Sequence, residues 1–176
     1  MTISADFRQK LIAAIPGLRA FGMSLTARAD MADDLVQETL MKAWKHHDSF
    51  DPGTNLRAWL YTILRNEFYT QLRKRKREVE DADGVYSSQV AVAGEQEGHL
   101  DLEDLRGALA KLPEDQREAI LLIGASGFSY EEAAEICGVA VGTIKSRVNR
   151  ARKRLSVLME DKNDGSSNKA GEQSLG

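Results

Sequence analysis

Hydrophobic and polar residues alternate at helical spacing along most of this chain. Apolar residues that recur every three or four positions are typical of amphipathic helices, whereas a half-buried strand alternates every second residue. The pattern therefore predicts an all-α fold. The predicted helices are two short ones at 7–15 and 18–25, with Pro16 opening the second, then 30–47, 55–77, 102–112 and 113–123, followed by a helix-turn-helix over 129–154.

The segment 129–154 carries the clearest local signals. Ser129 and Glu132 have the spacing of a capping box, in which each side chain bonds to the backbone N–H of the other residue. Gly138 follows and can adopt the left-handed conformation that a sharp turn needs. A second helix is predicted from about Val141. Its inward side is formed by Ile144, Val148 and Ala151.

The outward side of this second helix is strongly basic. Residues 145–154 include six cationic side chains, and no acid follows until Glu160. In a helix-turn-helix, residues early in the second helix contact base edges in the major groove, while flanking cations contact phosphates. The pattern therefore indicates duplex DNA binding, with a solvated basic helix on an ordinary bundle as the alternative. The candidate contacts are Thr143, Lys145, Ser146, Arg147, Asn149 and Arg150.

Helix 30–47 has two faces of different character. The face predicted to enter the core consists of Val36, Leu40, Ala43 and Trp44. The other face places a methionine beside acids and an amide, and consists of Asp34, Gln37, Glu38, Met41 and Lys45. An exposed methionine with a polar rim is typical of a protein–protein contact, because its side chain adapts to the partner surface. An ordinary solvated face with one apolar residue is the alternative.

Helix 55–77, with Asn55 as a plausible N-cap, has an apolar and a basic-aromatic stripe. The predicted core stripe is Leu56, Trp59, Leu60, Ile63, Leu64 and Phe68. The outer stripe, with Asn66 beside it, is Arg57, Tyr61, Arg65, Tyr69 and Arg73. Cations neutralise phosphates and aromatic rings stack on unpaired bases, so this stripe favours partly single-stranded DNA. A solvated basic helix with tyrosines packed at its edges is the alternative.

The net charge of −3 conceals a segregation of charge along the chain. Residues 1–77 contain 13 Lys and Arg against 8 Asp and Glu, whereas residues 78–110 contain 1 against 9. Two basic regions are thus separated by an acidic one. This composition predicts two small helical domains at 1–77 and 101–160, a flexible acidic linker at 78–100 and a disordered tail at 161–176.

No residue pattern in the sequence predicts a metal or cofactor. Cys137 is the only cysteine, and none of the three histidines shares a ligand spacing with it. No apolar run approaches the ~18 residues that would span a bilayer, and the first ten residues lack a hydrophobic signal region. A soluble, cytoplasmic protein is therefore expected.

Taken together, three segments resemble the extracytoplasmic-function (ECF) class of bacterial sigma factors. DDLVQETLMKAW (33–44) and NLRAWLYTILRNEFYTQLRKR (55–75) are similar to region 2 of that family, and VGTIKSRVNRARKRL (141–155) is similar to region 4. The nearest subgroup is that of the alphaproteobacterial general-stress-response sigma factors, judged from SFDPGTNLRAWLYTILRNEFYTQLRKRKRE.

The resemblance implies a non-enzymatic subunit that binds core RNA polymerase and directs promoter-specific initiation. It implies docking on the β′ clamp helices through Asp34, Gln37, Glu38 and Met41, and a further contact with the β flap. The segment 141–155 would read a GGAA-type −35 element. An anti-sigma factor, released by a phosphorylated antagonist, is also implied. The −10 element would be melted and read by Asn55, Arg57, Tyr61, Arg65, Asn66, Tyr69 and Arg73.

Two other classes of function fit parts of the sequence. A stand-alone helix-turn-helix repressor or activator shares the C-terminal motif but leaves the basic-aromatic stripe of helix 55–77 unexplained. An enzyme that acts on nucleic acid would need Mg²⁺, and the only tight acidic cluster is Asp33, Asp34 and Glu38. Helical geometry separates Asp33 from Asp34 by about 100°, which disfavours a shared site.

Overall fold

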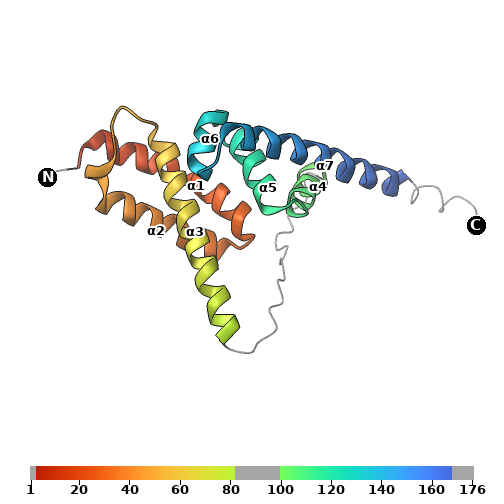
Figure 1. Ribbon diagram of the computed structural model, residues 1–176, viewed down its shortest axis with the longest axis horizontal. Helices are drawn as coiled ribbons and strands as arrows, with labels where there is room; N and C mark the ends of the chain where they lie inside the picture. Colours follow the sequence, from red (N-terminus) through yellow and green to blue (C-terminus); the bar gives the residue numbers. More distant parts are fainter. Residues whose placement is uncertain (1–2, 82–99, 168–176) are drawn as a thin grey trace, which may run out of the picture.

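The computed structural model describes residues 3–81 and 100–167, and all regular structure in these two stretches is helical (Figure 1). The predicted all-α fold is confirmed. In chain order the elements are α1 (Ala5–Thr26), α2 (Ala29–Lys45), the 3-10 turn η1 (His47–Ser49), α3 (Leu56–Asp81), α4 (Leu100–Ala110), α5 (Glu114–Ile120), the π-helical turn η2 (Leu121–Ala125), α6 (Tyr130–Cys137) and α7 (Val141–Ser167).

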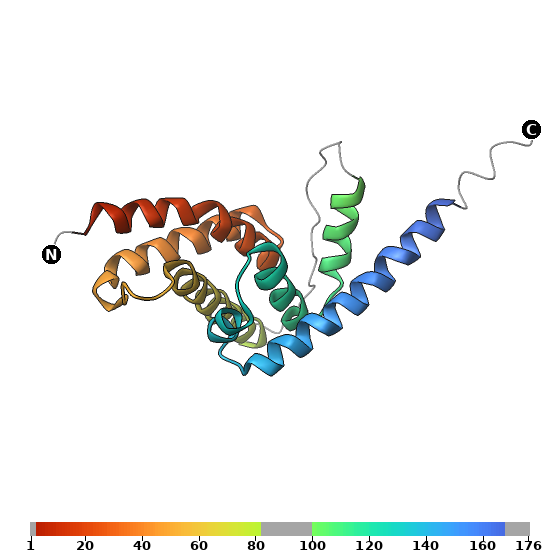
Figure 2. The ribbon, with the colours of Figure 1, turned by 90° about the horizontal axis from the view of Figure 1, so that it is seen from above.

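Helices α1, α2 and α3 form an N-terminal unit. Figure 2 shows α1 and α2 lying side by side, and an ion pair of 2.7 Å between Arg19 Nε and Asp33 Oδ1 ties them together. Leucines that are at most 1% exposed fill the space between the three helices: Leu18, Leu35, Leu60 and Leu64. Burial of these side chains is the main favourable term for this packing, since each contributes about 1.5–3 kcal/mol.

Helix α1 is continuous, so the prediction of two short helices separated at Pro16 is wrong. Proline in a helix interior removes one backbone hydrogen bond, and it usually ends or kinks the helix. Here the buried residues continue at helical spacing on both sides of Pro16, and this unbroken packing keeps the two halves in one helix. The buried residues are Leu11, Ala14, Leu18, Phe21, Gly22 and Leu25.

Helices α4 to α7 form a C-terminal unit in which α7 packs against α4, α5 and α6. The predicted helix-turn-helix is confirmed in detail. The Ser129 side chain accepts from the Glu132 N–H, the Glu132 carboxylate accepts from the Ser129 N–H, and Gly138 is left-handed with φ of 65°. The predicted inward residues of α7, Ile144, Val148 and Ala151, are at most 1% exposed.

The two units share one continuous core, because α6 packs directly on α3 (Figure 2). Tyr61 of α3 lies at the centre of this contact. Its ring stacks on Phe21 at 5.0 Å between centroids and meets the edge of Phe128 at 4.8 Å. Phe128 precedes α6 and is 4% exposed. The N- and C-terminal units therefore pack against each other through aromatic side chains.

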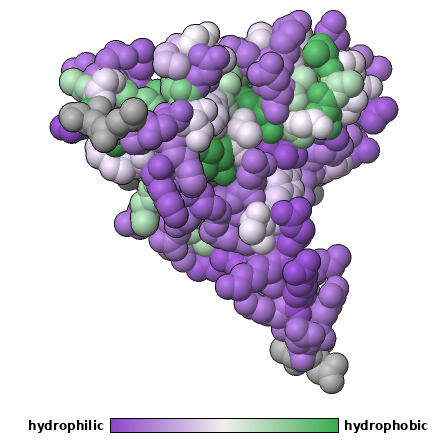
Figure 3. Space-filling model, turned by 60° about the vertical axis from the view of Figure 1, so that its left-hand side comes forward, coloured by the Kyte–Doolittle hydropathy of each residue, from purple (hydrophilic) through white to green (hydrophobic). Residues whose placement is uncertain are grey.

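Helices α3 and α7 both extend beyond their predicted ends. Helix α3 reaches Asp81 rather than 77, so the first residues assigned to the linker are helical, and its C-terminal part projects from the bundle with a hydrophilic surface (Figures 1 and 3). Helix α7 reaches Ser167, so the prediction of disorder is wrong for 161–167. The rest of the predicted linker, 82–99, and of the tail, 168–176, lies outside the described residues.

Gly17 permits the close approach of Tyr61 to α1, because a methyl group at Gly17 would stand 2.7 Å from Tyr61 Oη. We expect Gly17→Ala to lower the free energy of unfolding by about 1–3 kcal/mol through overpacking. Adding Tyr61→Phe, which removes the hydroxyl, should restore most of that loss. Urea denaturation measures both effects.

The control for this prediction is Gly22→Ala, where the new methyl would come no closer than 3.4 Å to Ala32. Alanine ordinarily stabilises a helix interior by roughly 1 kcal/mol relative to glycine. An increase in stability for Gly17→Ala alone would contradict the close approach of Tyr61.

Candidate nucleic-acid and protein interfaces

The outward face of α7 is open to solvent where the sequence predicts contacts with base edges. Lys145, Ser146, Asn149 and Arg150 are exposed, and Thr143 is half-buried. The buried stripe on the opposite side of α7 fixes these side chains on a rigid helix, and the turn at Gly138 sets the start of that helix away from α6. This arrangement presents donors and acceptors along one ridge, as major-groove recognition requires.

Arg147 differs from its neighbours on α7. Its side chain is 20% exposed and its Nε lies 3.5 Å from Asp115 Oδ2 of α5. The position between the exposed Ser146 and the buried Val148 turns it toward α5. Arg147 therefore does not share the solvent-exposed ridge with the other candidates, and in this conformation its charge is partly neutralised within the C-terminal unit.

The basic-aromatic stripe of α3 is largely covered by the C-terminal unit. The sequence predicts seven −10 contacts on this helix and at its start. Among them, Asn66 and Arg73 are exposed, and Arg73 bonds to Thr70 of the same helix. The other five are buried by the C-terminal unit or bonded to it: Asn55, Arg57, Tyr61, Arg65 and Tyr69.

The prediction that Tyr61 lies on an exposed face is wrong, since Tyr61 is 1% exposed. Helical periodicity separates the side of α3 that faces α1 and α2 from the opposite side, and Tyr61 falls on the boundary. The periodicity of one helix contains no signal that a second unit covers the opposite side. In the predicted core stripe, Trp59 and Ile63 are only partly buried.

Glu118 of α5 is the central acidic residue of this contact. It is 1% exposed, its carboxylate accepts a charge-assisted hydrogen bond from Arg65 Nε, and Tyr69 Oη donates to it at 3.4 Å. The Arg65 guanidinium also stacks 4.6 Å from the Tyr69 ring. Sequence reasoning missed Glu118. Glu118 lies four residues before the buried Leu122, which places an acid on the apolar face of α5. That placement was the available sign that Glu118 is buried and needs a partner.

Burial perturbs the proton affinities in this cluster. Burial raises the pKa of Glu118 above its ordinary value, although Arg65 acts in the opposite direction. Burial acts to lower the pKa of Arg65, but the adjacent Glu118 charge outweighs it, and the net pKa is raised. Burial and the Glu118 charge together raise the pKa of Tyr69 to about 12. Arg65 and Tyr69 therefore remain protonated and act as donors to Glu118.

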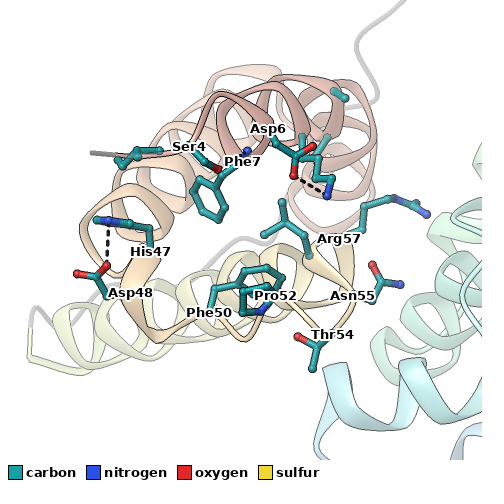
Figure 4. A pocket seen from close by; sticks show the side chains of 15 residues that line it. Ser4, Asp6, Phe7, His47, Asp48, Phe50, Pro52, Thr54, Asn55 and Arg57 are labelled. Atoms are coloured by element: carbon teal, nitrogen blue, oxygen red, sulfur yellow. Dashed lines mark hydrogen bonds and ion pairs between the residues drawn. The ribbon is translucent and has the colours of Figure 1, made fainter. Parts of the chain in front are cut away.

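A cavity of about 680 Å³ adjoins the loop before α3 (Figure 4). One wall comes from the start of α1, including Phe7, and the other from the segment between η1 and α3, including Phe50, with Asn55 and Arg57 at its edge. The ring centroids of Phe7 and Phe50 lie 6.1 Å apart. The cavity therefore joins an aromatic wall to two polar side chains that belong to the candidate −10 set.

The outer face of α2 has the predicted polar residues at its surface. Asp34, Gln37 and Met41 are exposed, with Met41 at 61%, and Glu38 is half-buried. Glu38 Oε1 lies 3.9 Å from Lys42 Nζ, and Lys42 also pairs with Glu67 of α3. Hydrogen bonding to Lys42 lowers the pKa of Glu67, so that carboxylate stays charged and secures α2 to α3.

The prediction that Trp44 belongs to the core is wrong, because it is 45% exposed. The Arg8 guanidinium of α1 lies 5.9 Å from its ring. Ile12, one turn after Arg8, is 59% exposed, and Met41 lies one turn before Trp44. The outer face of α2 is therefore more apolar than its sequence suggested, because the core positions are taken by Leu35, Val36, Thr39 and Ala43.

The described part of the chain offers no group of three or more His, Cys, Asp or Glu side chains that could hold a metal ion. Asp33, which the nucleic-acid enzyme alternative required, is paired with Arg19 instead. None of the helices in that part combines the length and the apolar composition that crossing a membrane requires.

Comparison with known proteins identifies both units. Residues 11–78 match the family described as Sigma-70 region 2, and residues 102–155 match Sigma-70, region 4. The chain is 60% identical over 159 residues to the ECF RNA polymerase sigma factor EcfG of Rhodopseudomonas palustris (strain TIE-1). That match covers 90% of this chain and 88% of the relative.

Two solved structures resemble the fold over both units. One is the sigma factor RpoE in complex with the anti-sigma factor NepR from Bartonella quintana. It has a TM-score of 0.81 and 62% identity, with 89% of this chain and 98% of that chain covered. The other is CnrH in complex with the cytosolic domain of CnrY, with a TM-score of 0.64, 31% identity and 88% of each chain covered.

The single cysteine gives a measurable consequence of burial at the contact between the units. Cys137 is 6% exposed, and burial raises the pKa of its thiol from 9.0 to about 11. At about pH 8 its thiolate fraction should be about 100-fold lower than that of an ordinary thiol. Because the thiolate is the nucleophile, labelling by an aromatic disulfide reagent should be at least about 100-fold slower in the folded chain than in urea. Equal rates in the two states would contradict this burial.

Proposed function

The chain belongs to the extracytoplasmic-function family of RNA polymerase sigma factors. We propose that the outer faces of α2, α3 and α7 bind different parts of the polymerase–promoter complex. As a sigma factor, it directs promoter-specific initiation of transcription. A polymerase binds DNA through its phosphates without sequence preference, so a detachable subunit supplies the sequence reading. In this proposal the polymerase performs the catalysis, and the chain is a regulatory subunit that works in the cytoplasm.

The C-terminal unit reads the −35 element through the start of α7. The observation that carries this assignment is the ridge of Lys145, Ser146, Asn149 and Arg150, which is exposed and held in place by a fully buried stripe on the same helix. Thr143 stands at the edge of the ridge. Arg147 would reach a phosphate only after leaving Asp115, so its contribution is to affinity rather than to base discrimination.

The N-terminal unit holds the non-template strand of the −10 element. Cationic and aromatic groups alternate along α3, and the cavity of Figure 4 opens beside the loop that precedes it. Stacking on an aromatic side chain is worth about 1–3 kcal/mol per base, and it is available only to unpaired bases. The proposed contacts are Asn55, Arg57, Tyr61, Arg65, Asn66, Tyr69 and Arg73.

The outer face of α2 docks on the β′ clamp helices of core polymerase. Asp34, Gln37, Glu38 and Met41 supply a polar rim around an apolar anchor, and the exposed Trp44 extends the apolar part of that surface. Aromatic residues and methionine are enriched in protein interfaces. The C-terminal unit makes the second contact, with the β flap.

An anti-sigma factor regulates the chain in the general stress response. Two similar proteins, RpoE and CnrH, have been solved with bound partners, which are the anti-sigma factor NepR and the cytosolic domain of CnrY. Their similarity to this chain extends over both units, so an inhibitor of that kind could contact both at once.

Runoff transcription with purified core RNA polymerase tests the proposed function most simply. A library of promoters with GGAA-type −35 elements should give promoter-directed transcripts only when this chain is added. A stand-alone repressor would instead bind duplex operator DNA tightly without polymerase and would start no transcripts, so a gel shift with the chain alone separates the two.

Arg150→Ala should reduce runoff transcription from a −35-dependent promoter by about tenfold, since a good base contact discriminates by about 1–3 kcal/mol. Capture of the chain by core polymerase should be unchanged. Lys153→Ala is the comparison, because an exposed cation farther along α7 is expected to lower affinity for all sequences alike. Loss of polymerase capture by Arg150→Ala would contradict the division of labour.

Glu38→Arg should weaken capture of the chain by core polymerase at least about tenfold, because it reverses a charge at the docking face and repels the neighbouring Lys42. Glu135→Arg makes the same charge change on an exposed position of α6 and should leave capture intact. Pull-down with tagged core polymerase measures both variants, and unchanged capture by Glu38→Arg would remove α2 from the dock.

A further inference from the structure

One lysine on the outer part of α2 lies between two glutamates. Lys42 Nζ lies 3.9 Å from Glu38 Oε1 of the same helix, and it donates to Glu67 Oε2 of α3. Glu38 and Lys42 are four residues apart, so their side chains are neighbours on the surface of α2. The charge of Lys42 is thus shared, unequally, between an acid of its own helix and an acid of α3.

Glu67 is the stronger of the two partners. Its side chain is 12% exposed, against 41% for Glu38, so water and salt screen its attraction for Lys42 less. Gln71 Nε2 donates to the other Glu67 carboxylate oxygen at 3.0 Å, which fixes the orientation of that carboxylate. An exposed lysine and glutamate four residues apart attract each other only weakly. Lys42 is therefore held at α3.

The position of Lys42 determines how much charge Glu38 can offer to a partner. A carboxylate that is neutralised by a lysine of its own helix attracts a partner's cation less, and the cation must displace that lysine before it can bind. With Lys42 held by Glu67, the Glu38 carboxylate keeps most of its charge beside the exposed Met41. Asp34, one turn before Glu38, is also exposed, so the two acids form one edge of the dock.

We propose that Glu67 is a positioning residue for the polymerase dock: by holding Lys42 at α3, it leaves the Glu38 carboxylate available to a lysine or arginine of core polymerase. This inference rests on the proposed docking role of α2. Glu67 itself belongs to α3, and it acts on the dock through Lys42. Complementary charge of this kind speeds association and fixes the register of two surfaces.

A purely structural role for Glu67 makes a different prediction. The ion pair between Lys42 and Glu67 also joins α2 to α3, so its loss could weaken the dock by loosening the two helices. In that case, removal of both charges should be at least as harmful as removal of one. If Glu67 acts by holding Lys42 away from Glu38, removal of both charges should instead restore the dock.

Glu67→Gln in the full chain is the first variant, because it removes the charge and keeps the shape. Lys42 should then turn to Glu38, and the dissociation constant for core polymerase should rise about two- to fivefold, in keeping with the strength of exposed ion pairs. Titration of fluorescently labelled core polymerase with the unlabelled chain measures it. Glu78→Gln removes a charge from an exposed position of the same helix and should leave the dissociation constant unchanged.

The double variant Glu67→Gln with Lys42→Gln is the decisive one. It has no lysine to neutralise Glu38, so the dissociation constant should return to that of the unmodified chain. This recovery cannot come from a repaired contact between α2 and α3, because the ion pair is absent from the double variant as well. Urea denaturation of each variant reports that the chain is folded under the conditions of the titration.

The outcomes separate this inference from the proposed dock. Unchanged binding by Glu67→Gln would overturn the positioning role. Weakened binding that persists in the double variant would also overturn it, and it would leave the ion pair as a tie between α2 and α3. If Glu38→Arg keeps full capture by core polymerase, the dock on α2 fails, and the positioning role fails with it. Loss of capture in Glu38→Arg, with either of the first two results, overturns the positioning role alone.

Discussion

The burial of Glu118 against Arg65 is the interaction on which the arrangement of the two units depends. A carboxylate that is 1% exposed needs a cation and hydrogen-bond donors, and here Arg65 and Tyr69 of α3 in the other unit donate to it. The aromatic contact between Tyr61 and Phe128 adds apolar burial beside the ion pair. Because both contacts use α3, that helix is buried on two sides, and the chain has one continuous core.

This contact leaves the candidate faces of α2, α3 and α7 exposed to different degrees. The faces of α2 and α7 are presented to solvent by helices whose opposite sides are buried, so they are ready to bind without rearrangement. The candidate −10 face of α3 is largely covered by the C-terminal unit, although Asn66 and Arg73 are exposed on it.

Much of the fold follows from local signals in the sequence. The capping box of Ser129 and Glu132, the left-handed Gly138 and the buried stripe of α7 depend on residues a few positions apart, and all were predictable. The predicted helix break at Pro16 is wrong because packing along the whole of α1 outweighs the local preference of proline for ending a helix. The predicted burial of Trp44 is wrong because smaller side chains, including Ala43 and Thr39, fill the inner face of α2.

The candidate sites show the same difference between local signals and contacts between distant residues. The ridge of α7 and the outer face of α2 each lie on one amphipathic helix, so periodicity alone located most of their residues. The coverage of α3 involves Glu118, some fifty positions farther along the chain, with residues between them that the structure does not describe. Periodicity within one helix cannot indicate such a partner. The acid on the apolar face of α5 was the one sign that a cation from elsewhere would be needed.

Energy transfer between dyes on the two units tests the central claim most directly. Cysteines at exposed Glu80 of α3 and Val157 of α7, in a Cys137→Ala background, report their separation. The account predicts a single transfer population in the free chain, because the two units share one core. A broad distribution, or several transfer populations, would contradict a fixed contact between the two units.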